Sequence, residues 1–127
     1  MKIIHVDMNK YARYAMEKDI KELVPNAELH CFNAPDPALA FAKAHGCDVL
    51  ITEIDLWLEE LAGFRLAKAI QELNPQVNII FVTVSDEYET ARELSRELSE
   101  LNVSGLIPKP WNINELAAVF GNLSLPL

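Results

Sequence analysis

Four short apolar runs mark the chain, and each is closed by a polar side chain. The four polar residues are Asp7, Glu53, Thr83 and Lys109. Apolar runs of this length are typical of strands that are buried on both faces of a parallel sheet. The carboxyl ends of such strands meet at one edge of the sheet, where α/β proteins place their functional sites. The sequence therefore predicts a parallel sheet that gathers these four side chains in one pocket.

Strand-like and helix-like segments alternate along the whole sequence. We expect five strands, at 2–7, 27–32, 48–53, 77–83 and 105–109. The second of them alternates in polarity, which indicates an edge strand. Apolar residues at helical spacing predict helices at 9–24, 36–46, 64–73 and 86–101, and a last one that starts at 112. The count is (βα)5, an α/β fold in which helices cover both faces of a doubly wound, five-stranded parallel sheet.

Two of the predicted helices carry specific start patterns. Asp36 followed by Pro37 predicts an N-cap with proline at the first helical position, and Gly46 predicts the end of that helix. Asn112 with Glu115 three residues later is typical of a capping box. Both patterns set expected boundaries that the structure can check.

The size and charge of the chain exclude several kinds of protein. Its 127 residues suit one domain, which we expect at 1–122, with 123–127 as a tail or the start of a linker. There are 19 acidic and 11 basic residues, a formal net charge of −8, which argues against direct nucleic-acid binding because phosphate contacts need a basic surface. The sequence contains no run of 18 apolar residues, so we expect no membrane span and a cytoplasmic location.

Several stretches of the sequence resemble the receiver domain of bacterial two-component response regulators. They are KIIHVDMNK, CDVLITEIDL, GFRLAKAIQELNPQVNIIFVT and SGLIPKPWNINEL, and together they span essentially the whole chain. This resemblance implies a flavodoxin-like topology with strand order 2-1-3-4-5. It also implies a signalling protein rather than an enzyme.

The resemblance assigns a role to each strand-end residue. In the family, two adjacent acids and an Asp at the end of the third strand hold Mg²⁺, and that Asp accepts a phosphoryl group from a histidine kinase. A hydroxyl and a lysine then bind the phosphoryl group. By position, Asp7 matches the first acid, Met8 the second acid, Glu53 the phosphoacceptor, Thr83 the hydroxyl and Lys109 the lysine.

Two of these positions depart from the family. Mg²⁺ prefers hard oxygen ligands, and Met8 offers a soft, uncharged thioether. Glu53 is longer than Asp by one methylene, so its carboxylate reaches about 1.5 Å further, and a shift of that size can slow an in-line transfer by about 100-fold. We therefore expect a poor phosphoacceptor with no cofactor, or with Mg²⁺ bound weakly by Asp7 and Glu53.

The same substitution allows two accounts of Glu53. Its carboxylate could accept hydrogen bonds from Lys109 and Thr83 and so mimic a phosphoryl group, although with less charge and fewer oxygens. Alternatively, Glu53 forms a purely structural ion pair with Lys109. Asp55, two residues beyond the strand end, is a weaker alternative acceptor.

Other departures concern the surface that receivers use for signalling. Leu106 stands where the family has a switch Tyr or Phe, and the segment between Thr83 and Lys109 is longer than usual. The charge alternation on the helix at 86–101 is compatible with pairing, so a homodimer through 86–120 is one expected assembly.

These observations lead to one functional hypothesis and two alternatives. The hypothesis is an atypical receiver that acts without phosphorylation, through contact with a histidine kinase or other signalling protein, on a fused or separate output such as a transcription factor. The first alternative is a conventional Mg²⁺-dependent receiver that uses Glu53 or Asp55. The second is a small α/β enzyme with an acid/base cluster of Asp7, Glu53 and Lys109.

Overall fold

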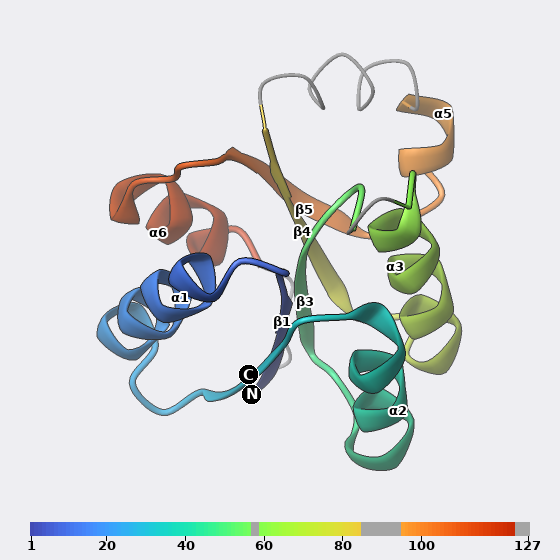
Figure 1. Cartoon of the computed structure of the whole chain (residues 1–127), viewed down its shortest axis with the longest axis horizontal. Helices are drawn as coiled ribbons and strands as arrows, with labels where there is room; N and C mark the ends of the chain where they lie inside the picture. Colours follow the sequence, from blue (N-terminus) through green and yellow to red (C-terminus); the bar gives the residue numbers. More distant parts are fainter. Residues whose placement is uncertain (57–58, 85–94, 124–127) are drawn as a thin grey trace.

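The fold is an open parallel sheet between two layers of helices (Figure 1). The computed structural model describes residues 1–56, 59–84 and 95–123. Five strands pair in the order β2-β1-β3-β4-β5, all parallel. The strands are β1 (Lys2–Val6), β2 (Glu28–Phe32), β3 (Val49–Glu53), β4 (Asn78–Thr83) and β5 (Val103–Pro108). The predicted fold class and strand order are confirmed, and β2 is the expected edge strand.

Helices pack on both faces of the sheet, as the apolar strands require. α1 (Lys10–Leu23) and α6 (Ile113–Gly121) cover one face, and α2 (Pro35–His45), α3 (Ala62–Leu73) and the short α5 (Ser95–Leu98) cover the other (Figure 1). The predicted helix at 86–101 lies largely outside the described residues, which resume at 95. Residues 124–127 of the predicted tail lie outside them too.

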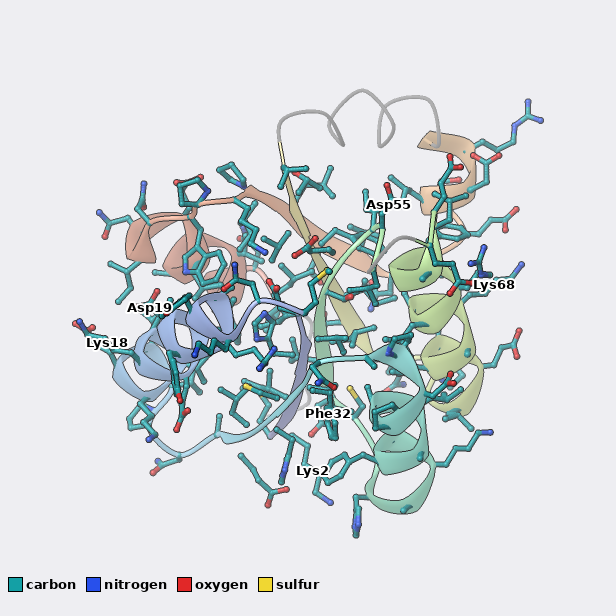
Figure 2. All side chains as sticks on the ribbon, in the orientation of Figure 1. Lys2, Lys18, Asp19, Phe32, Asp55 and Lys68 are labelled. Atoms are coloured by element: carbon teal, nitrogen blue, oxygen red, sulfur yellow. The ribbon has the colours of Figure 1, made fainter. Side chains whose placement is uncertain are left out.

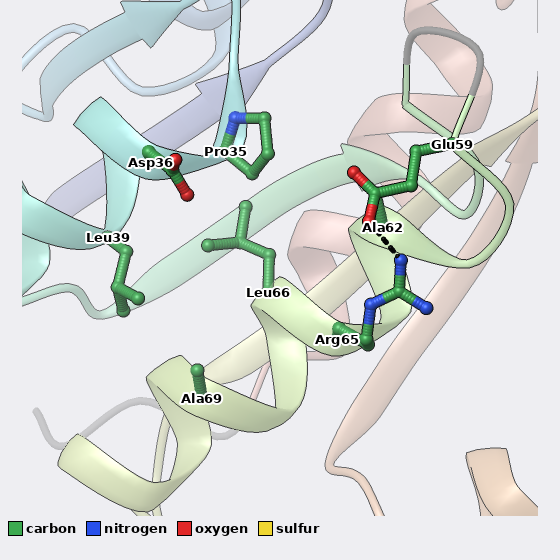
Figure 3. Close-up of a pocket in the computed structure, with 8 residues that line it drawn as sticks. All are labelled: Pro35, Asp36, Leu39, Glu59, Ala62, Arg65, Leu66 and Ala69. Carbon is green, nitrogen blue, oxygen red and sulfur yellow. Dashed lines mark hydrogen bonds and ion pairs between the residues drawn. The ribbon is translucent and has the colours of Figure 1, made fainter.

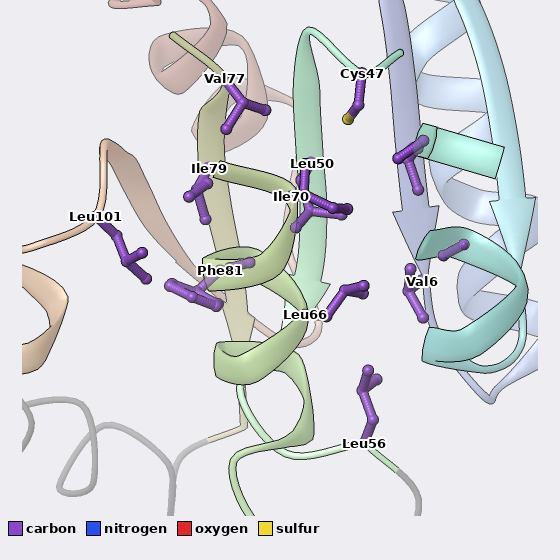
Figure 4. Close-up of a cluster of buried hydrophobic side chains, with 14 of the residues drawn as sticks. Val6, Cys47, Leu50, Leu56, Leu66, Ile70, Val77, Ile79, Phe81 and Leu101 are labelled. Atoms are coloured by element: carbon purple, nitrogen blue, oxygen red, sulfur yellow. The ribbon is translucent and has the colours of Figure 1, made fainter. Parts of the chain in front are cut away.

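Each sheet face has its own apolar cluster. The cluster under α2 and α3 contains Leu50, Ile79 and Phe81, which are fully buried and pack against Leu66 and Ile70 of α3 (Figure 4). The cluster under α1 and α6 is built from the alternate strand positions together with residues of the two helices: Ile3, Met16, Ile20, Val49, Ile51, Ile80, Val82, Ile107 and Leu116. Burial of both faces explains why the strands lack polar alternation.

Some predicted boundaries were wrong. α2 begins at Pro35 with Ala34 as its N-cap, so Asp36 lies in the first turn instead of capping the helix. Proline is favoured at the first helical position, and Pro35 takes that position before Pro37 can. Gly46 does end the helix, with a φ of 88°.

The start of β5 was also misplaced. The strand begins at Val103 rather than at Gly105, because Ile79 pairs with Val103 and the next residue, Ile80, pairs with Gly105. This irregularity leaves Ser104 as an extra residue, whose hydroxyl donates to the side-chain oxygen of buried Asn78 at 2.9 Å. The capping box at Asn112 and Glu115 is confirmed.

Gly63 lets the loop after β3 close tightly onto the strand end. Its N–H donates to the carbonyl oxygen of Ile54 at 2.8 Å, and a Cβ at this position would collide with the carbonyl oxygen of Glu53. The absence of a side chain at 63 therefore helps to set the position of the Glu53 backbone.

We expect Gly63→Ala to lower the free energy of unfolding by about 1–3 kcal/mol, the usual cost of overpacking. Gly121→Ala is the matched control, because a Cβ there meets nothing within 4 Å. That control should change stability by about 1 kcal/mol or less, in the stabilising direction. Urea denaturation of both variants measures the difference, and equal effects would contradict the close approach at Gly63.

Candidate functional site

An ion cluster occupies the carboxyl edge of the sheet. Asp7 follows β1, Glu53 ends β3, and Lys109 follows β5. The Lys109 Nζ lies 2.8 Å from Asp7 Oδ2 and 2.5 Å from Glu53 Oε1. The Asp7 side chain is 0% exposed, that of Glu53 12% and that of Lys109 20%. One ammonium therefore bridges two carboxylates that are almost shielded from water.

Asp7 is fixed by further contacts from the loop and from α1. Its Oδ1 accepts from the N–H of Asn9 at 2.8 Å, and Arg13 Nη1 donates to its backbone carbonyl at 2.6 Å. Asn9 is also the N-cap of α1. The start of α1 and the end of β1 are thus tied together around Asp7.

Burial and the hydrogen bonds of Lys109 within the cluster act in opposite directions on the pKa values of Glu53 and Lys109. Burial raises the pKa of Glu53, the hydrogen bond from Lys109 opposes this, and the charge of Asp7 reinforces it. Burial alone would lower the pKa of Lys109, but hydrogen bonds with Asp7 and Glu53 outweigh it and raise that pKa. The ammonium is therefore held in its charged form, as a buried lysine between two carboxylates should be.

Thr83 lies beside the cluster but makes a different contact from the one predicted by mimicry. It is fully buried at the end of β4, and its hydroxyl donates to the Ile107 carbonyl oxygen over a long 3.5 Å. Its own carbonyl oxygen accepts from the Lys109 N–H at 2.8 Å. Glu53 thus accepts from Lys109, while the Thr83 hydroxyl is directed to β5.

Asp55 has a structural role in the loop after β3 (Figure 2). Its Oδ1 accepts from the N–H of Leu61 at 2.6 Å. Leu61 has a left-handed backbone conformation with a φ of 63°. This conformation is uncommon for residues other than Gly, Asn and Asp. Asp55 therefore stabilises the strained turn that leads into α3.

The residues at this edge do not fit a magnesium ion well. Lys109 already occupies one oxygen of Asp7 and one of Glu53, and Asn9 occupies the other oxygen of Asp7. Met8 is 40% exposed and contributes no oxygen side chain. Within residues 1–56, 59–84 and 95–123, no group of three or more His, Cys, Asp or Glu side chains could hold a metal. Three of the four carboxylate oxygens of Asp7 and Glu53 thus already accept hydrogen bonds from the protein itself.

Three residues beside the cluster, His5, Arg13 and Trp111, were not predicted as part of the site. His5, in β1, is buried, and burial lowers its pKa to about 4 even though the charge of Asp7 opposes this. Trp111 lies edge-on to the His5 ring and donates its indole N–H to Asp19 of α1 at 2.9 Å. Arg13 could have been suspected, since it adjoins the apolar stripe of its helix. The Trp111–Asp19 pair is a tertiary contact with no signature in the sequence.

A cavity between α2 and α3 is a weaker candidate for a functional site than the ion cluster. It has a volume of about 180 Å³ and is lined by Asp36, Glu59 and Arg65 together with apolar residues (Figure 3). Two of its charged groups already pair, with Arg65 Nη2 donating to Glu59 Oε1 at 2.5 Å. The ion cluster at 7, 53 and 109 is therefore the best candidate site.

The comparison with protein families decides the relationship. The model of the response regulator receiver domain matches residues 3–120. The chain belongs to this family. Receiver domains are signalling modules of two-component systems rather than typical enzymes, and they interact with kinases and output domains. None of the curated proteins matches the sequence.

Solved structures agree on the fold. The signal receiver domain of an HD domain-containing protein from Pseudomonas fluorescens Pf-5 has a TM-score of 0.80 at 19% identity, over 96% of this chain and 92% of that one. Chemotaxis protein CheY4 of Vibrio cholerae has a TM-score of 0.79 at 21% identity, over 96% and 97%. A two component transcriptional regulator AraC from Clostridium phytofermentans ISDg has 0.77 at 19%, over 97% and 95%. Among the described residues, no helix is long and apolar enough to cross a membrane.

Removing the bridging ammonium should be costly. Lys109→Met leaves two carboxylates buried without a cation, and we expect it to lower the free energy of unfolding by about 3 kcal/mol. Lys21→Met breaks the exposed pair with Glu17, 2.9 Å long, and should cost no more than about 0.5 kcal/mol. Thermal and urea denaturation at neutral pH measure both, and a Lys109→Met variant as stable as Lys21→Met would show that the cluster contributes little.

Proposed function

We propose that this receiver signals without a phosphorylation cycle. Its ion cluster stands permanently where other receivers form a transient phosphoryl–lysine contact. The domain then acts by contact with a histidine kinase or another signalling protein in the cytoplasm. It regulates a fused or separate output, which we propose to be transcriptional.

The observation that carries this proposal is the double contact of Lys109. The ammonium that should bind an incoming phosphoryl group is already hydrogen-bonded to Glu53 at 2.5 Å and to Asp7 at 2.8 Å. A phosphodonor would have to displace both contacts and use a carboxylate that is one bond too long. Both requirements slow in-line transfer, which depends on precise positioning.

Partial mimicry of the phosphorylated state fits the same geometry. Glu53 supplies one anionic partner for Lys109, but Thr83, which would complete the set, donates to Ile107 instead. We propose that Lys109 keeps its contact with Glu53 permanently, as it would keep one with a phosphoryl group. The Thr83 hydroxyl instead keeps its contact with Ile107. Leu106, 38% exposed on β5, replaces the aromatic side chain that would report the change.

Several solved neighbours support a transcriptional output. The neighbour from Clostridium phytofermentans ISDg is described as a two component transcriptional regulator. NtrX from Brucella abortus matches 96% of this chain with a TM-score of 0.79 at 20% identity, and only 26% of the NtrX chain is covered. Most of the NtrX chain therefore lies outside the match, and we propose a similar joined output, or an equivalent separate partner, here. A homodimer through 86–120 remains part of the proposal.

Intact-mass measurement after incubation with acetyl phosphate and Mg²⁺ tests the proposal. We expect the wild type to gain no phosphoryl group, because Lys109 is occupied and the acceptor geometry is altered. The double variant Met8→Asp/Glu53→Asp restores both acids and should become phosphorylated, at least about 100-fold faster than the wild type. This gain should require Mg²⁺.

A stoichiometric adduct on the wild type would contradict the proposal. Its loss in Glu53→Gln would identify a conventional receiver that uses Glu53, and its loss in Asp55→Asn would identify Asp55. The double variant shows in the same experiment that the protein is folded and that the donor is active.

A further inference from the structure

A groove lies between α3 and the segment that contains α5. Its volume is about 210 Å³, and Phe64 and Leu101 supply apolar walls. The side chain of Gln71 clamps the two sides together, since its Nε2 donates to the Glu100 carbonyl oxygen at 2.9 Å and its Oε1 accepts from the Asn102 N–H at 2.7 Å. Gln71 therefore joins the two sides of the groove.

The charges around this groove are predominantly negative. Glu72, Glu97 and Glu100 line it, and so does Lys68. Figure 2 shows Lys68 on α3. Three carboxylates against one ammonium leave a net negative charge beside an apolar wall. A ligand with a cationic head and an apolar stem is the complement of this surface.

Glu97 adds an observation of a different kind. Its Oε2 is buried, and in the part of the chain that the structure describes it has no hydrogen-bond partner. An ionised carboxylate accepts hydrogen bonds and donates none. Burying one of its oxygens without a donor is therefore unfavourable. Lys68 is exposed and forms no ion pair among the described residues. Glu97, which carries this unused acceptor, therefore lines the same groove as Lys68 without forming an ion pair with it.

We propose that this groove binds an arginine side chain from a partner protein. The planar guanidinium is suited to donate to Glu97 while it stacks on the ring of Phe64. The aliphatic stem of the arginine would lie against Leu101, as long cationic side chains do on apolar surfaces. Arginine is preferred over lysine because it is less strongly hydrated and donates through a planar fork.

The groove does not include the ion cluster. Its lining follows α3 from Phe64 to Glu72 and continues to Pro75, and it contains none of Asp7, Glu53 and Lys109. A partner that docks here would therefore contact residues other than those of the strand-end site.

The test is an NMR titration of the ¹⁵N-labelled protein with acetyl-Leu-Arg-Leu-amide. The matched ligand is acetyl-Leu-citrulline-Leu-amide, which keeps the shape and loses the charge. We expect the arginine peptide to shift the backbone amides of Lys68, Gln71 and Leu101 in a saturable way, and the citrulline peptide to bind at least tenfold more weakly.

Protein variants assign the contact. Glu97→Gln should weaken the arginine peptide at least tenfold, whereas Glu17→Gln, an equal change of charge on exposed α1, should leave affinity within twofold. If Glu97→Gln fails to fold, Glu97→Asp replaces it as the test variant, because it keeps the charge and shortens the side chain. Its affinity for the arginine peptide should be measurable but lower than that of the wild type. Shifts that are absent, equal for both peptides or unchanged in Glu97→Gln would overturn the proposal. So would binding that appears only in Lys68→Met, because Lys68 would then be the natural occupant.

Discussion

The ammonium of Lys109 between two carboxylates is the interaction on which the rest of this site depends. It joins the ends of β1, β3 and β5, which approach one another only because parallel pairing brings their carboxyl ends to one edge. A lysine at the end of a buried strand needs partners there, and two carboxylates need a cation. Each group therefore makes the burial of the others tolerable.

The surrounding structure holds the three groups in register. The Asn9 amide and the Arg13 guanidinium fix Asp7 from the start of α1, and Gly63 allows the next loop to close against the backbone of Glu53. The N–H of Lys109 donates to the carbonyl oxygen of Thr83, so its backbone is tied to β4 as well. The backbones that carry the three groups are thus each held by a contact from a neighbouring segment.

Much of this arrangement was predictable, because it follows from local patterns. Apolar runs without alternation indicate buried parallel strands, and the rule that their carboxyl ends share an edge brings Asp7, Glu53 and Lys109 together. The direction of the Thr83 hydroxyl could not be predicted, because it depends on the pairing of β4 with β5 and on the acceptor at Ile107. The start of β5 was missed for a similar reason, since a single unpaired residue in the ladder leaves no mark in the sequence.

The two predicted helix starts show which local patterns can be read from the sequence and which cannot. Asn112 and Glu115 form the predicted capping box because both partners lie within one turn. Asp36 was a plausible cap, but Pro35, which lies between Ala34 and Asp36, takes the first helical position and makes Ala34 the N-cap. The contacts of Arg13 with Asp7 and of Trp111 with Asp19 join separate elements and required the fold.

The most direct measurement of the central claim is NMR detection of the Lys109 side-chain ammonium. If Lys109 bridges Asp7 and Glu53, its ammonium protons exchange slowly with water at neutral pH without any phosphodonor, and the signal disappears or broadens in Glu53→Gln. An ammonium at Lys109 that exchanges as fast as those of the surface lysines, with or without Glu53, would contradict the account.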